Sequence, residues 1–308
     1  MTTTTIRIEP DGPFSLAEAA GFGFGPNTGR PTYTNAGMKL AFATDDFRSH
    51  AFVSLNQDPD GTVIGEVDSD ADPEAVTAQV ARILSLNGSG TGWMRVGESD
   101  PVLGSLQRAH PGLRPVSFHS PYEAAAWSII SARRQRAQAT TVRNRIAAAL
   151  GRVYGEGREQ LFAFPTPEKL LELKEVQSLE EVKVQRLHAV AHAALEGQLD
   201  AGPLLGMSTV DAMAQLQKLP GIGPLYATLI LLRSTGAIDT MTGLEPRLPT
   251  YLGHFYSLGA DATSEQADRI IDGWRPFRTW SSVLFRVGGD RAGYELPANP
   301  AFAGRHHR

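Results

Sequence analysis

A short segment rich in glycine and proline, set between two helical patterns, constrains the fold of this chain more than any other feature. It reads Leu219-Pro220-Gly221-Ile222-Gly223-Pro224. The apolar spacing of Val210–Leu216 before it and of Leu225–Arg233 after it is typical of helices. A dinucleotide-binding G-x-G loop would need a strand before it, so the pattern excludes that interpretation. We therefore predict two helices joined by a tight hairpin, in which two glycines permit positive φ and close approach of the backbone.

The start of the second helix is a candidate phosphate site. Pro224 suits the first turn of a helix. The first N–H groups of a helix have no intrahelical partners, and they attract phosphate oxygens. Gly221, Gly223 and Pro224 are therefore predicted to bind a phosphate group. A structural turn between two core helices would have the same pattern, and this alternative stays open.

Charge is distributed unevenly along the 308 residues, whose net charge is −4. Residues 1–100 contain 6 basic and 14 acidic residues, whereas residues 101–308 contain 23 and 19. Residues 124–155 include six arginines and no acidic residue. Local fields attract a polyanion more than the total charge does, so this run predicts a contact with one. A solvated helix face is the alternative interpretation.

The composition excludes several kinds of site and of location. The chain has no cysteine, which excludes disulfides, thiolate-bound zinc and a cysteine nucleophile. No apolar run approaches the ~18 residues typical of a membrane helix. The first residues lack the basic and apolar regions of a signal peptide. We therefore expect a soluble, cytoplasmic protein with no membrane partner.

The periodicity of the sequence changes near residue 95. Before it, turn residues separate segments rich in β-formers, which predict strands near Thr3–Ile8, Met38–Ala43, Ala51–Leu55 and Val63–Val67. Pro73–Leu86 has the spacing of an amphipathic helix, with Asp72 as its N-cap. From residue 96 onward the patterns are helical. The predicted fold class is α+β, with a mixed α/β domain over residues 1–95 and an all-α domain over residues 96–308. The glycine-rich Asn87–Gly92 is interpreted as a flexible boundary.

Several motifs together resemble the helix-hairpin-helix DNA glycosylase superfamily, and most closely its 3-methyladenine DNA glycosylase II branch. The strongest is the hairpin with its second helix, LPGIGPLYATLILLRSTG, followed by an acidic site. The further matches are Asp100–Leu103, Pro111–Arg114, Tyr122–Ser131 and Arg275–Trp280. The resemblance covers roughly residues 95–290 and implies that the all-α region is a helix-hairpin-helix glycosylase domain.

The resemblance implies a catalytic carboxylate shortly after the second hairpin helix. Such a carboxylate stabilises positive charge on the sugar and orients a water molecule. Counting without gaps from the hairpin places Glu245 at this position, where the family has aspartate, and Asp239 upstream of it. Three interpretations stay open: Glu245 is catalytic, Asp239 enters the site by a different loop path, or neither is catalytic. In the third, Glu245 caps the next helix or pairs with Arg247.

The resemblance also implies the walls of a base pocket and the absence of strand cleavage. Family members that cut the strand carry a lysine where this chain has Leu225, so a Schiff base is not expected. The same position is often aromatic in the alkylpurine branch, where rings stack on cationic bases. We expect an aliphatic wall at Leu225 unless neighbouring aromatic residues complete it. The candidates are Trp127, Tyr226, Phe277 and Trp280.

The resemblance also assigns a role to the loop after Ser131. In the resembling family this loop carries the side chains that fill the gap left by an extruded nucleotide. It reads Ala132-Arg133-Arg134-Gln135-Arg136. We expect Arg133 or Gln135 to insert into the duplex and the other arginines to contact phosphates. A surface loop without a partner is the alternative.

These features predict a monofunctional DNA glycosylase of base excision repair that hydrolyses the N-glycosidic bond of alkylated purines, of the 3-methyladenine type. The alternative is a helix-hairpin-helix protein that binds lesions with weak or no catalysis. The expected partner is double-stranded DNA with damaged bases, bound by a monomer that is nucleoid-associated if bacterial. No cofactor is expected to be required. The resemblance implies a Na⁺ or K⁺ ion at the backbone carbonyls of Gln217, Leu219 and Ile222, because carbonyl oxygens suit hard cations.

Overall fold

The computed structural model describes residues 2–22, 37–157, 160–241 and 247–293. Its N-terminal part is a four-stranded antiparallel sheet with strand order β1-β4-β3-β2. The strands are β1 (Thr2–Ile8), β2 (Met38–Ala43), β3 (His50–Gln57) and β4 (Val63–Ser69). They confirm the four predicted strands. In β3, Ala51, Val53 and Leu55 are fully buried while their neighbours are partly exposed, so alternation in the sequence marks one buried face.

The remaining described elements are mostly helices, and an α+β fold is thereby confirmed. The predicted Pro73–Leu86 helix is α2 (Pro73–Ile83), and Asp72 caps it as predicted. The helices that follow are α3 (Gly90–Ser99), α4 (Pro101–Ala109), α5 (Pro121–Ser131), α6 (Arg136–Leu150), α7 (Pro167–Leu170), α8 (Glu181–Leu195), α9 (Ala201–Gly206), α10 (Thr209–Leu216), α11 (Pro224–Ser234), α12 (Leu248–Phe255), α13 (Ser264–Asp272) and α14 (Arg278–Arg291). The sequence did not predict α3, α9, the short α1 (Leu16–Ala20) or the small β5–β6 hairpin (Arg152–Tyr154 and Leu161–Ala163).

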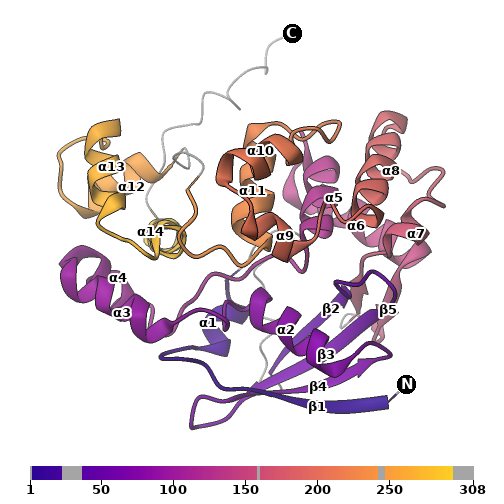
Figure 1. Cartoon of the computed structure of the whole chain (residues 1–308), viewed down its shortest axis with the longest axis horizontal. Helices are drawn as coiled ribbons and strands as arrows, with labels where there is room; N and C mark the ends of the chain where they lie inside the picture. Colours follow the sequence, from indigo (N-terminus) through magenta and orange to yellow (C-terminus); the bar gives the residue numbers. More distant parts are fainter. Residues whose placement is uncertain (1, 23–36, 158–159, 242–246, 294–308) are drawn as a thin grey trace.

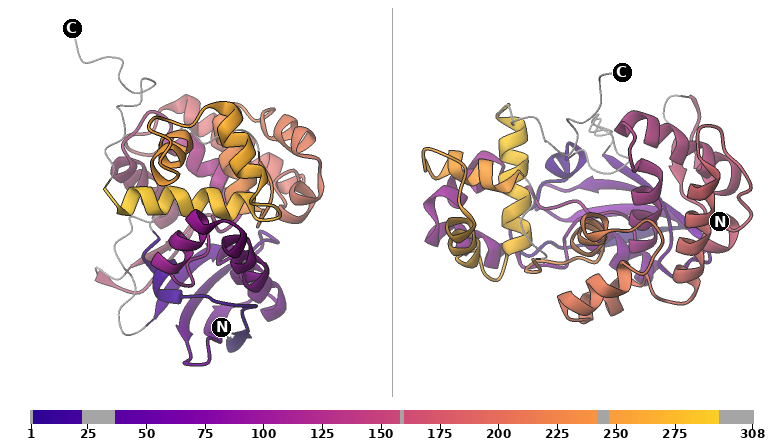
Figure 2. Two further views of the ribbon diagram at one scale, coloured as in Figure 1. Left: turned by 90° about the vertical axis from the view of Figure 1, so that its left-hand side faces the viewer. Right: turned by 90° about the horizontal axis from the view of Figure 1, so that it is seen from above.

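Most of the helices form two groups, which lie above and beside the sheet (Figures 1 and 2). One group contains α3, α4 and the C-terminal helices α12–α14, whose apolar residues share a core with the sheet and α2. The other group, α5–α11, has a second core of its own. The boundary predicted at residue 95 falls inside α3, and the first core groups residues from both sides of it. The division at residue 95 therefore stays a prediction.

The interpretation of Asn87–Gly92 as a flexible segment is wrong, and its role as a domain boundary stays a prediction. Ser89 caps α3, and its hydroxyl accepts a hydrogen bond from the Gly92 N–H at 3.0 Å. A Cβ atom at Gly90 would lie 2.1 Å from the Arg114 guanidinium, and one at Gly88 would lie 2.7 Å from the Trp280 ring. These glycines allow close packing of side chains and do not serve as a flexible linker.

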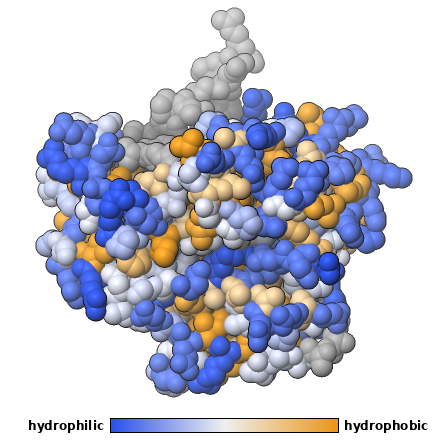
Figure 3. All heavy atoms as spheres, in the orientation of Figure 1, coloured by the Kyte–Doolittle hydropathy of each residue, from blue (hydrophilic) through white to orange (hydrophobic). Residues whose placement is uncertain are grey.

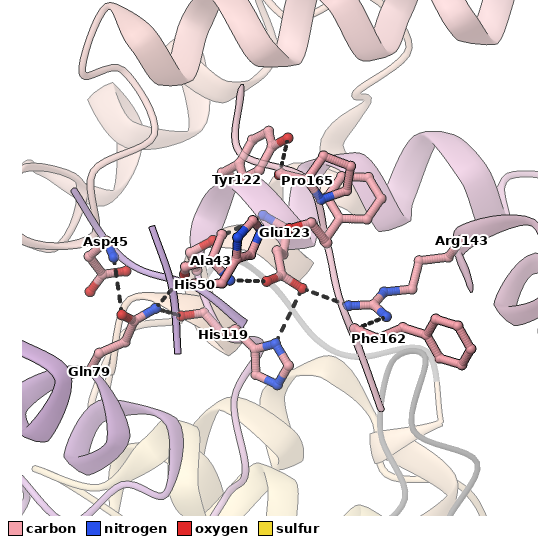
Figure 4. A network of polar contacts seen from close by, with 12 residues as sticks. Ala43, Asp45, His50, Gln79, His119, Tyr122, Glu123, Arg143, Phe162 and Pro165 are labelled. Atoms are coloured by element: carbon pink, nitrogen blue, oxygen red, sulfur yellow. Dashed lines mark hydrogen bonds and ion pairs between the residues drawn. The ribbon is translucent and has the colours of Figure 1, made fainter. Parts of the chain in front are cut away.

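A buried polar network joins the second helical group to the sheet (Figure 4). Glu123 on α5 accepts hydrogen bonds from Arg143 on α6 at 3.1 Å and from the N–H of Ala43 on β2 at 3.4 Å. Its carboxylate also lies 3.2 Å from His119 Nδ1. Burial acts to raise the pKa of Glu123, but His119 and Arg143 outweigh it and lower that pKa to about 2.

The face of the molecule seen in Figure 3 is largely polar. Hydrophilic residues cover most of the face in Figure 3, and hydrophobic residues lie there in small separate groups. None of the helices among the described residues is long and apolar enough to cross a membrane. Within the same part of the chain, histidine and acidic side chains form no cluster of three that could hold a metal ion.

Candidate nucleic-acid interface

The predicted hairpin is present and its tip faces solvent. It lies between α10 and α11, with Gly223 as the N-cap of α11 and Pro224 in the first turn. Leu219 and Ile222 are 7 % and 3 % exposed and anchor it in the second core. Gly221 has φ of 90°, a conformation that side chains rarely adopt, and it is exposed together with Gly223 and Pro224.

The tip of the hairpin offers backbone groups without partners. Among the hydrogen bonds of the described residues, none uses the N–H of Gly221 or Gly223. The carbonyl of Gly223 accepts from Ala227 at 2.9 Å, which starts the hydrogen-bond ladder of α11. Free N–H donors at the N-terminus of a helix are suited to an anion.

The backbone carbonyl oxygens predicted to bind a monovalent cation have lone pairs that hydrogen bonds do not use. The Leu219 carbonyl accepts a hydrogen bond from Ile222 at 3.0 Å, and it keeps a second lone pair. In the described ranges, hydrogen bonds do not use the carbonyls of Gln217 or Ile222. Neutral oxygens of this kind fit Na⁺ or K⁺. Occupancy by an ion stays a prediction.

The arginine loop, residues 132–136, begins where α5 ends. Arg133 has φ of 58° and is exposed, as are Gln135 and Arg136. Arg134 is turned inward, with its side chain 15 % exposed and its guanidinium 2.7 Å from the Glu180 carboxylate. Three of the four predicted contact residues of this loop therefore face solvent.

The arginine loop and the hairpin are neighbours. Helix α11 packs against α5, and the side chain of Tyr226 on the first turn of α11 lies close to Ser131 at the end of α5. Arg186 on α8 lies against the hairpin, since a Cβ atom at Gly221 would meet its Cδ at 2.9 Å. The two segments that the sequence singled out separately thus belong to one surface.

This surface is positively charged, and two of its basic residues, Lys183 and Arg186 on α8, were missed by sequence reasoning. Burial lowers the pKa of the Lys183 ammonium, and the nearby Arg134, Arg186 and Arg133 lower it further. Glu180 acts in the opposite direction. The spacing of Lys183 and Arg186 places both on one face of a helix, but only the fold brings that face to the hairpin.

The predicted pocket residues divide into two sets. Leu225 is 63 % exposed at the hairpin, and Tyr226 beside it is half-buried. Trp127, Phe277 and Trp280 are 8 %, 5 % and 2 % exposed and belong to the two cores. Trp280 packs edge-on against Trp93 at 5.4 Å. Core packing accounts for these three rings, and their role in a base pocket stays a prediction.

An open groove of about 560 Å³ runs along α10 towards the hairpin. Its lining consists of Thr209, Val210, Met213, Ala214, Gln217 and Met241. Gln217 connects the groove to the hairpin, and Met241 directly precedes the segment that contains Glu245. The groove is therefore bordered by α10, by the start of the hairpin and by the chain just before residue 242.

The two candidate carboxylates differ in what can be described. Glu245 lies outside the described residues. Asp239 accepts hydrogen bonds from the Arg278 backbone N–H at 3.0 Å and from its guanidinium at 2.9 Å, and it lies 3.6 Å from Arg275. It thus caps the first turn of α14. Arg247, two residues after Glu245 in the sequence, pairs with Asp290 near the end of α14 at 3.0 Å.

No family model matches the chain. It is 24 % identical over 165 residues to a DNA-3-methyladenine glycosylase of Bacillus subtilis (strain 168), a match that covers 52 % of this chain and 54 % of that protein. The chain thus spans about half the length of this relative.

Two solved structures share the fold. The 3-methyladenine DNA glycosylase of Archaeoglobus fulgidus matches with a TM-score of 0.70 and 19 % identity, covering 93 % of this chain and 98 % of that one. The 8-oxoguanine glycosylase/lyase of Clostridium acetobutylicum, in complex with double-stranded DNA, matches with a TM-score of 0.58 and 16 % identity, covering 85 % and 100 %. The chain is thus similar in sequence to a DNA-3-methyladenine glycosylase over about half its length, and it shares its fold with solved structures of DNA glycosylases.

Proposed function

We propose that the protein is a DNA glycosylase that hydrolyses the N-glycosidic bond of an alkylated purine in duplex DNA. The observation that carries the proposal is the exposed hairpin, whose free N–H groups adjoin a cluster of cations. A phosphate is the anion that this combination favours. The names of the relative and of both structural neighbours support glycosylase chemistry on DNA.

In this proposal Glu245 is the catalytic carboxylate. Departure of the base builds positive charge on the sugar, which a fixed carboxylate stabilises while it orients the attacking water. Asp239 is the weaker candidate, because its oxygens accept hydrogen bonds from Arg278 and cap α14. We assign the ion pair between Asp239 and Arg278 the role of anchoring the segment that leads to Glu245.

A base that is cationic through alkylation at N3 or N7 is the proposed substrate. Such a base leaves easily and makes a smaller demand on the carboxylate, which suits a glutamate where the family has aspartate. The exposed Leu225 offers an aliphatic wall and Tyr226 an adjacent ring. A hairpin-bound Na⁺ or K⁺ would add positive charge next to the phosphate, with Gln217, Leu219 and Ile222 holding it.

Strand cleavage is not part of the proposal. The neighbour from Clostridium acetobutylicum is described as a glycosylase/lyase. A lyase of this superfamily needs an amine nucleophile at the start of the second hairpin helix, where this chain has Leu225. Lys218 is exposed on the hairpin but precedes the glycines, and we assign it a phosphate contact.

The test is chromatography of bases released from methylated duplex DNA by the wild type, Glu245→Gln and Asp239→Asn. We expect Glu245→Gln to lose release by about a hundredfold or more while its affinity for duplex DNA is retained. We expect the DNA strand to stay intact after the reaction and to break only when the abasic sites are treated with alkali. Tight duplex binding by a wild type that releases no base would instead establish a lesion-binding protein.

A further inference from the structure

The arginine loop has a backbone conformation that needs support from outside the loop. Arg133 has φ of 58°, in the left-handed region that residues with a side chain seldom adopt. The loop makes a backbone hydrogen bond from the Arg134 N–H to the Ser131 carbonyl at 3.0 Å. Arg133 and Gln135 nevertheless project into solvent. An unfavourable conformation persists only where neighbouring groups fix it.

Lys183 on α8 supplies that support. Its ammonium group donates hydrogen bonds to the Ala132 carbonyl at 2.8 Å and to the Ile130 carbonyl at 3.4 Å. These carbonyls belong to the end of α5, where they have no intrahelical partners. A cation at this end of a helix also interacts favourably with the helix dipole.

The position of Lys183 is electrostatically unfavourable in other respects. Its side chain is 10 % exposed, and Arg133, Arg134 and Arg186 all act against its positive charge. The acidic residue nearest to it, Glu180, is 3.9 Å away, 60 % exposed and already bonded to Arg134. The carbonyl contacts are therefore what holds a buried ammonium beside three guanidinium groups.

The same face of α8 also contacts the hairpin. Arg186 follows Lys183 by three residues and lies against Gly221. Residues three apart on a helix are neighbours on its surface. α8 thus contacts both the arginine loop and the hairpin, and it fixes the spacing between them.

We propose that Lys183 is a positioning residue, whose ammonium group holds the arginine loop in the shape that fills the gap left when a nucleotide leaves the duplex. The inference rests on the proposed glycosylase function. Gap filling is needed only when the base is extruded from a paired strand. A single strand needs no such insertion, and the two substrates therefore separate positioning from general destabilisation.

The experiment compares Lys183→Met with Lys183→Arg and with Lys169→Met, an exposed control on α7 that pairs with Glu172. Single-turnover base release is measured on a methylated duplex and on the same methylated strand alone, and thermal unfolding is recorded for every variant. We expect Lys183→Met to lose about tenfold or more on the duplex and less than about twofold on the single strand. We expect Lys183→Arg to retain most of the wild-type rate of base release on the duplex, and Lys169→Met to behave as the wild type.

Equal losses on both substrates, or no loss on either, would overturn the positioning role. If Lys183→Met does not fold, Lys183→Gln, which retains a neutral donor, is measured in the same way and judged by the same ratio. A wild type that releases no base from either substrate would overturn the glycosylase function itself, and this inference with it. That result is read from the wild type alone, so the two failures are distinguishable.

Discussion

Two clusters of charged side chains in this protein differ in whether their charges are paired. In the buried network around Glu123, the carboxylate, Arg143 and His119 all have partners within 3.2 Å (Figure 4). On the surface beside the hairpin, the side chains of Arg133, Arg186 and Lys218 form no hydrogen bond or ion pair with another described residue.

The difference separates charges that serve the fold from charges that serve a ligand. A buried charge must be paired, because an uncompensated one destabilises the folded state. Unpaired cations that repel one another contribute little to folding but form a field that attracts a polyanion. Substitutions in the first cluster should therefore change stability, and substitutions in the second should change binding.

The largest effect is expected for Glu123→Gln. The substitution removes the charge that compensates Arg143, whose side chain is 8 % exposed. Breaking a buried pair from one side destabilises by about 3–5 kcal/mol, and urea unfolding measures this directly.

The matched control is Glu172→Gln, because Glu172 pairs with Lys169 in the open, with both side chains 57 % exposed. We expect a change of about 0–1 kcal/mol there. Similar losses in both variants would show that burial of the network does not decide its contribution.

Acid should weaken the same network. The pKa of Glu123 is about 2 in the folded protein, against a usual value of 4.5. Because the folded pKa is the lower one, the stabilisation is fully present above about pH 4.5 and is lost as the pH falls towards 2. The difference corresponds to about 3 kcal/mol. Unfolding free energies of the wild type and Glu123→Gln, measured between pH 6 and pH 3, should converge towards the acid end.

A smaller effect is expected for Asp239→Asn. Its pair with Arg278 is partly exposed, with side-chain exposures of 29 % and 18 %. We expect a loss of about 1–2 kcal/mol in unfolding free energy. We also expect a moderate fall in base release, because Asp239 fixes the chain six residues before Glu245, the proposed catalytic carboxylate. A loss of release by a hundredfold at unchanged stability would instead identify Asp239 as catalytic.

Local sequence patterns predicted the elements whose form depends on local chemistry. The alternation in β3 and the glycines and proline of the hairpin are examples, because strand faces and tight turns are set by neighbouring residues. The interpretation of Asn87–Gly92 as flexible was wrong. Glycine is needed at position 90 because the Arg114 side chain packs against it, and only the fold brings Arg114 there.

The candidate site was predictable only in part for the same reason. The arginine loop and the hairpin were both identified from local motifs. Lys183 and Arg186 were missed, because their role depends on how α8 packs between those two segments. No spacing rule within α8 indicates which of its faces will meet a loop fifty residues earlier in the chain.

The smallest change in stability, with a clear change in binding, is expected for Arg133→Met and Arg186→Met. Each unpaired cation that contacts a phosphate contributes about 0.9 to the slope of log K against log salt. We expect each substitution to reduce the slope by about that amount and to change the unfolding free energy by less than about 0.5 kcal/mol. Fluorescence anisotropy with a labelled duplex at several salt concentrations measures the slope.

The control is Arg269→Met on α13, whose side chain is 73 % exposed and paired with Glu265 in the other helical group. Its slope should equal that of the wild type, and a decrease there as large as for Arg133 would show that binding follows total charge rather than the cluster beside the hairpin.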